Sequence, residues 1–136
     1  MNLNSKAEKI FNIFENIIPE YYHSETIRKS QVQMAIDISA FLDKNESKRI
    51  MFIEAPVGTG KSLGALIPSM IESKIEKNCR VVYATATINL QGQLMNSEVP
   101  LLKELSLIKQ PILAKGKAHY YCHREFKYKK NKFTPK

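Results

Sequence analysis

Residues 54–62 read Glu54-Ala55-Pro56-Val57-Gly58-Thr59-Gly60-Lys61-Ser62, and the fold expected of the whole chain depends on this stretch. An apolar run, residues 50–53, precedes it, and a helix-forming run follows it. In such a strand–loop–helix unit, the backbone N–H groups of a glycine-rich loop surround the phosphates of a nucleotide. The spacing therefore predicts a phosphate-binding loop, with Ala55 at the position where the strict pattern has glycine.

Each loop residue has an expected part in holding the nucleotide. The two glycines allow the backbone to approach the phosphates closely. Lys61 would reach the β- and γ-phosphates, and the hydroxyl of Ser62 would bind the Mg²⁺ that bridges them. The alternative is a glycine-rich turn that joins a strand to a helix and holds no ligand, and the Gly-x-Gly-Lys-Ser spacing favours the nucleotide. The predicted nucleotide contacts of the loop are Val57, Gly58, Thr59, Gly60, Lys61 and Ser62.

The pattern of apolar residues predicts alternating helices and strands. Strands are expected at residues 50–53, 80–85 and 111–114, where the sequence is apolar without polar alternation or rich in β-branched residues. Helices are expected at residues 5–18, stopped by Pro19, and at 30–43, 61–77 with a kink near Pro68, 89–95 and 100–107. Alternation of this kind is typical of an α/β fold with a parallel sheet.

Charge is distributed unevenly along the chain. The net charge is +8, but residues 1–114 carry 13 Lys/Arg against 12 Asp/Glu, whereas residues 115–136 carry eight against one. Aromatic residues lie among the charges of this basic tail, a combination that suits nucleic-acid phosphates and bases. The alternative is a solvated, partly disordered end.

Several protein classes do not fit the composition. No apolar run approaches the length of a membrane span, and the N-terminus has no apolar core of a secretory signal. Two cysteines, 43 positions apart, are too few for a disulfide framework. A cytoplasmic protein with reduced thiols and no membrane partner is therefore expected.

Four segments, in the expected order, resemble motifs of the DinG/XPD-type helicases of superfamily 2. Residues 54–62 resemble their phosphate loop, and residues 28–34 (RKSQVQM) resemble their adenine-reading Q motif. The resemblance implies ATP and Mg²⁺ as ligands, with Arg28 and Gln31 beside the adenine, whereas Gln31 by itself also fits an exposed residue in the first turn of a helix. Residues 85–94 (TATINLQGQL) resemble motif Ia, which implies contacts to single-stranded DNA, while Thr87 alone also fits a helix cap. The implied DNA contacts are Thr85, Thr87, Asn89, Gln91 and Gln93.

The fourth segment, residues 115–122 (KGKAHYYC), resembles the one that supplies the first cluster ligand in iron–sulfur members of the family. The resemblance makes Cys122 the corresponding ligand. No cysteine follows it, so a cluster held by four cysteines cannot assemble from this chain alone. A site built from Cys122 with His119 and His123 is the alternative.

The resemblance implies an incomplete RecA-like P-loop NTPase, a three-layer parallel sheet of about three strands preceded by helices. The expected units are a helical segment at 1–27, a partial ATP-binding domain at 28–114 and a basic tail at 115–136. The 136 residues contain no Asp-Glu-x-His segment and no second RecA-like domain. We therefore expect the chain to be the ATP-binding front part of a DNA helicase that does not hydrolyse ATP alone. It is either a truncation or works with a separate chain that supplies the remaining helicase domains. The alternatives are a non-catalytic nucleotide- or DNA-binding module and a different P-loop ATPase, such as a kinase, for which residues 85–94 have no evident use.

Overall fold

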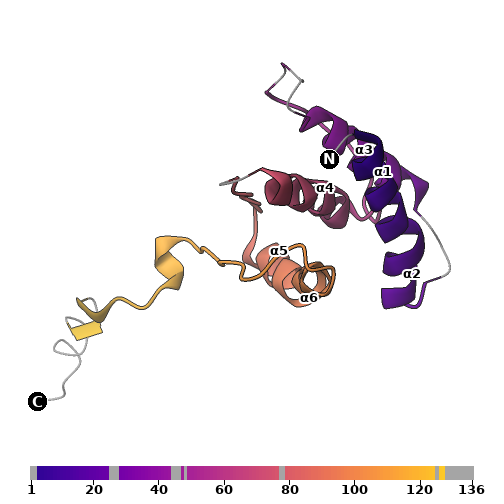
Figure 1. Ribbon diagram of the computed structural model, residues 1–136. Helices are drawn as coiled ribbons and strands as arrows, with labels where there is room; N and C mark the ends of the chain where they lie inside the picture. The colour runs from indigo at the N-terminus through magenta and orange to yellow at the C-terminus, as the bar shows by residue number, and fades with distance from the viewer. Residues whose placement is uncertain are drawn as a thin grey trace, which may run out of the picture.

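The chain folds into a cluster of helices from which the C-terminal part extends (Figure 1). The computed structural model describes residues 3–24, 28–43, 47, 49–76, 79–124 and 126–127. Two long helices, α3 (Lys29–Phe41) and α4 (Lys61–Ile75), pack against each other at its centre. They are preceded in the chain by α1 (Leu3–Asn12), the π turn η1 (Ile13–Ile17) and α2 (Ile18–Tyr21). They are followed by α5 (Ile88–Gln93), the π turn η2 (Leu94–Glu98) and α6 (Val99–Glu104). A short 3₁₀ turn, η3 (Lys117–His119), lies in the extended C-terminal part.

The expected parallel sheet is wrong, because no strand forms among the described residues. The segments predicted as strands, residues 50–53, 80–85 and 111–114, have no regular secondary structure. A strand is stable only when its backbone pairs with a neighbour and its side chains are covered. Here Phe52, Val82 and Ile112 are 93%, 90% and 92% exposed, so these apolar runs lie uncovered. The three-layer RecA-like architecture is therefore not present in this structure.

The helical predictions agree with the structure at most of their positions. The helix expected at 30–43 is α3. The helix expected at 61–77 is α4, with Pro68 inside it, and the end predicted at Lys77 lies outside the described residues. Two of the predicted helix boundaries are wrong. The first helical region continues past Pro19 to Tyr21, and the helices expected at 89–95 and 100–107 form one uninterrupted run from Ile88 to Glu104.

The helical runs at residues 3–21 and 88–104 each contain a π-helical turn that ends two residues before a proline. Pro19 and Pro100 are each the second residue of a short α-helix, α2 and α6, that follows η1 and η2. The residue before each proline donates its N–H five residues back, Ile18 to the carbonyl of Ile13 and Val99 to that of Leu94. A proline ring crowds the carbonyl four residues before it, and a wider turn relieves that crowding. The prolines therefore restart the helix rather than end it.

Among the described residues, an apolar core joins the helices that precede and follow α3 and α4. It lies where α1 and η1 pack on α3 and α4, and α6 closes it from the other side. Lys6 of α1 is 3% exposed and forms an ion pair with Glu72 of α4 at 2.7 Å, with Asp43 at 3.7 Å from the same nitrogen. The buried apolar residues of this core are Ile10, Ile13, Phe14, Val32, Ala35, Leu63, Leu66, Ile67, Ile71, Leu101, Leu102 and Leu107.

Beyond this core the described residues of the basic tail are exposed. Tyr121 contacts the ring of His123 edge-on, at a centroid distance of 4.8 Å, and the ring of Phe126 in a tilted arrangement, at 5.3 Å. Among the described helices, none is long and apolar enough to cross a membrane.

Candidate nucleotide site

The predicted phosphate loop, residues 54–62, leads into α4 and includes its first two residues, Lys61 and Ser62. Gly58 and Gly60 have φ of +85° and +78°, a left-handed conformation that side chains oppose, and Gly60 is the N-cap of the helix. The hydroxyl of Thr59 donates to the carbonyl of Pro56 at 2.7 Å and tightens the turn. The free N–H groups of the first turn of α4 therefore open at the loop, where a helix favours an anion.

Lys61 folds back over the loop that precedes it. Its ammonium donates to the carbonyls of Ala55 and Pro56, each at 2.8 Å. The side chain is exposed, so the ammonium is accessible from solvent as well as bonded to the loop. A charged donor held over a glycine turn is suited to a phosphate, because the ammonium and the phosphate carry opposite charges whereas a peptide carbonyl is neutral.

Gln31 connects α3 to the same loop. Its amide nitrogen donates to the carbonyl of Gly60 at 2.8 Å, and the residue is 5% exposed. The interpretation of Gln31 as an exposed first-turn residue is therefore wrong. A Cβ on Gly60 would overlap this amide, so only glycine fits the loop at that point without movement of Gln31. The adenine contact assigned to Gln31 stays a prediction.

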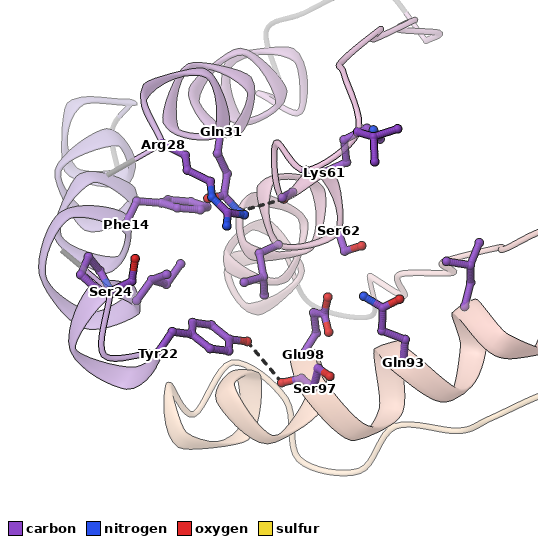
Figure 2. Close-up of a pocket in the computed structure, with 17 residues that line it drawn as sticks. Phe14, Tyr22, Ser24, Arg28, Gln31, Lys61, Ser62, Gln93, Ser97 and Glu98 are labelled. Atoms are coloured by element: carbon purple, nitrogen blue, oxygen red, sulfur yellow. Dashed lines mark hydrogen bonds between the residues drawn. The ribbon is translucent and has the colours of Figure 1, made fainter. Parts of the chain in front are cut away.

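A pocket of about 630 Å³ joins these groups (Figure 2). Such a volume lies within the range of pockets that hold small molecules. Figure 2 shows Arg28 and Gln31 on one side, Lys61 and Ser62 at the start of α4, and Tyr22, Ser97 and Glu98 on the opposite side. Of the eight residues predicted to contact the nucleotide, the pocket is lined by all but Thr59: Arg28, Gln31, Val57, Gly58, Gly60, Lys61 and Ser62.

The residues implied as DNA contacts point in several directions. Thr87 caps α5, since its hydroxyl accepts the N–H of Leu90 at 3.3 Å, as the alternative interpretation of this residue expects. Gln91 donates to the carbonyl of Ala114 at 3.4 Å and so holds the segment leading to the tail. Asn89 is exposed. Gln93 lines the pocket of about 630 Å³, and it also lines, with Thr85, a smaller neighbouring pocket of about 50 Å³.

Sequence reasoning missed the wall opposite Lys61. Tyr22 follows the last residue of α2, and its hydroxyl lies 3.4 Å from the carbonyl of Ser97, to which it donates. Glu98 is 9% exposed and lines both pockets. Burial raises the pKa of its carboxyl, and a hydrogen bond from its own backbone opposes this more weakly. Burial, and then the charge of Glu98, raise the pKa of the Tyr22 hydroxyl.

The cysteines do not form a metal site. Cys79 and Cys122 are both free and exposed, and within the described residues no three His, Cys, Asp or Glu side chains are grouped as metal ligands. A four-cysteine cluster needs more thiolates than the two this chain has, so these residues do not fit an iron–sulfur cluster. Ser62 does fit Mg²⁺ held together with nucleotide phosphates, because its hydroxyl lines the pocket beside Lys61.

The chain is similar to curated proteins named ATP-dependent DNA helicases. It is 35% identical over 122 residues, 90% of the chain, to DinG of Salmonella choleraesuis (strain SC-B67). It is 36% identical over 97 residues, 71% of the chain, to DinG of Escherichia coli (strain K12). It is 32% identical over 96 residues, 70% of the chain, to YoaA of Haemophilus influenzae. The chain spans only 16%, 13% and 14% of the lengths of these three relatives.

No family model matches the chain. No solved structure matches it either.

These similarities place the chain among helicase sequences. More particularly, over the segment that it matches, it belongs to the DinG-like helicases.

Proposed function

We propose that the pocket between the 54–62 loop, α3 and η2 binds ATP with Mg²⁺, as the ATP-binding part of a DinG-like helicase. The observation that carries the proposal is the convergence of two segments separated by about 30 positions. Gln31 bonds to Gly60, and both line the pocket that Lys61 and Ser62 enter from the start of α4. The names of the relatives, ATP-dependent DNA helicases, support the choice of ATP.

In this proposal the chain's own residues hold the phosphates at the loop. Lys61 exchanges the carbonyls of Ala55 and Pro56 for phosphate oxygens, while the N–H groups of the first turn of α4 face the same anion. Ser62 offers its hydroxyl to Mg²⁺, which neutralises phosphate charge when it is bound. Phe14 and Tyr22 line the pocket with apolar ring surface that suits a base.

Titration of the purified chain with Mg-ATP, followed by calorimetry or by amide chemical shifts, tests the proposal. Lys61→Ala should weaken binding roughly 10- to 100-fold, the range for hydrogen bonds to charged groups. Lys74→Ala is the matched control, because Lys74 is an exposed lysine of the same helix that does not line the pocket. Equal affinity of wild type and Lys61→Ala, or no saturable ATP binding, would refute an ATP site in this pocket.

We further propose that the α5 region contacts single-stranded DNA. Thr87 and Gln91 are engaged in the bonds described above, which leaves Asn89 as the exposed amide at the start of α5. Asn89→Ala should weaken binding of a fluorescent single-stranded oligonucleotide, measured by anisotropy at fixed salt because phosphate contacts are salt-dependent. Asn96→Ala, an exposed asparagine of η2, is the control. Identical affinities for the two variants would count against a contact at Asn89.

The chain alone is not expected to hydrolyse ATP. Its 136 residues lack an Asp-Glu-x-His segment, which the resemblance assigns to Mg²⁺ positioning and water activation. Phosphate release in the presence of single-stranded DNA should therefore stay at background. Turnover that Lys61→Ala abolishes would contradict this expectation.

A further inference from the structure

The wall of the pocket formed by η2 carries an acidic side chain with one unpaired oxygen. Glu98 is 9% exposed, and its Oε2 atom has no hydrogen-bond partner. The ion pairs found among the described residues, Lys6 with Asp43 and with Glu72, do not involve it. A buried acceptor left unpaired is costly, and a buried carboxylate more so. A ligand that brings a hydrogen-bond donor into the pocket would therefore stabilise Glu98.

The backbone at Glu98 is equally unusual. Glu98 is the last residue of the π turn η2, and Phe14, from the π turn η1, lines the same pocket. Turns of this kind are rare and frequently occur at functional sites. In Figure 2 the carboxylate of Glu98 points into the pocket, towards the side where Ser62 and Gln93 lie. The side chain is thus directed at the ligand space by a local departure from α-helical geometry.

Donors and acceptors are separated across the pocket. Lys61 and the N–H groups of the first turn of α4 are donors near the loop, where phosphates would lie. The carboxylate of Glu98 and the carbonyl of Ser97 are acceptors on the opposite side. A carboxylate repels phosphate and accepts from hydroxyl or amino groups. The part of a nucleotide that suits Glu98 is therefore the nucleoside.

We propose that Glu98 binds the ribose hydroxyls of the nucleotide held in this pocket and makes the site selective for ribonucleotides. The ribose presents two neighbouring hydroxyl donors, and a carboxylate accepts with two oxygens, a pairing that acidic side chains use in other nucleotide sites. The inference rests on the proposed ATP site and adds to it a residue that determines specificity.

Titrations of the full chain with ATP and with 2′,3′-dideoxy-ATP, followed by amide chemical shifts so that weak binding is measurable, test the proposal. Wild type should bind ATP roughly 10- to 100-fold more tightly than the dideoxy compound, the range for hydrogen bonds to a charged group. Glu98→Ala should bring the two affinities within about twofold of each other by weakening ATP alone. Glu98→Gln keeps the size of the side chain and should reduce the ratio in the same direction.

Glu104→Gln, an exposed glutamate of α6, is the matched control and should keep the wild-type ratio. ATP binding with the same preference in wild type and in both Glu98 variants would overturn the role of Glu98 and leave the ATP site intact. Equal binding of ATP and dideoxy-ATP by wild type would do the same. Absence of ATP binding to wild type would overturn the ATP site, and the role of Glu98 with it.

Discussion

Replacing Gly60 by alanine would place a methyl group where the amide of Gln31 lies. Gly60 also has φ of +78°, so the substitution has two separate costs. Gly58 is a natural control in the same loop: its φ is +85°, and a Cβ there would meet nothing within 4 Å. The two alanine variants share the backbone penalty and differ in the contact with Gln31.

The expected difference follows from these two costs. The left-handed conformation costs a non-glycine residue about 1–2 kcal/mol, which is the whole effect expected for Gly58→Ala. Gly60→Ala also displaces Gln31 from its 2.8 Å bond to the Gly60 carbonyl. Leaving a buried amide unpaired costs about 1–3 kcal/mol, so Gly60→Ala should lower the free energy of unfolding by about 2–5 kcal/mol in all. The loss of unfolding free energy in Gly60→Ala beyond that in Gly58→Ala measures how much the contact of Gln31 with Gly60 stabilises the packing of α3 against the loop.

Urea unfolding followed by circular dichroism measures both variants, and a double-mutant cycle with Gln31→Ala isolates the pair. In the Gln31→Ala background the obstructing amide is gone, so Gly60→Ala should cost only the backbone penalty of about 1–2 kcal/mol. Equal destabilisation by Gly58→Ala and Gly60→Ala in the wild-type background would refute the reasoning. A cycle with no coupling energy would refute it as well.

Two further predictions concern buried charge. Lys6→Met should destabilise the chain by about 3–5 kcal/mol because it leaves the carboxylate of Glu72 buried without its partner, and Lys6→Met with Glu72→Leu should recover most of the loss; a single variant within about 1 kcal/mol of wild type in urea unfolding would contradict this. The pKa of Glu98 is raised above 4.5 in the folded chain, so the folded state binds this proton more tightly than the unfolded state does. Its contribution to stability is therefore complete below that value and is lost as pH rises through the folded pKa, and Glu98→Gln should remove this component from a plot of unfolding free energy against pH. An unchanged pH profile in Glu98→Gln would count against the burial effect.

Helices were more predictable than strands in this chain for a physical reason. The bonds of a helix are local, so the spacing of residues such as Ala35 and Ile38 predicts α3 from its own sequence. A strand depends on a partner elsewhere, and an apolar run such as residues 50–53 does not specify one. Pro19 and Pro100 were misjudged at the level of the turn, because their sequence does not reveal that the preceding turn widens.

The residues of the candidate site fall into the same two groups, those that a local sequence pattern predicts and those that depend on contacts between distant segments. The loop glycines and Lys61 follow from a local pattern, and the structure gives that loop the left-handed residues and the helix start that the pattern requires. Tyr22 and Glu98 reach the pocket only because α2 and η2 come together across it, which no local signal reports. The position of Glu98 two residues before Pro100 is the single sequence feature that would have indicated a π turn there.

The bonds that hold the loop also limit how tightly it binds a phosphate. Lys61 already donates to two carbonyls, and Gln31 to a third, so a nucleotide exchanges hydrogen bonds at the loop and does not simply add them. The bonds from the Lys61 ammonium to the carbonyls are already charge-assisted, so exchanging them for bonds to phosphate oxygens gains less than the roughly 1.5–3 kcal/mol of a new charge-assisted bond. The cost of immobilising the ligand is subtracted from that smaller gain. We therefore expect the proposed binding of ATP by the chain alone to be weak.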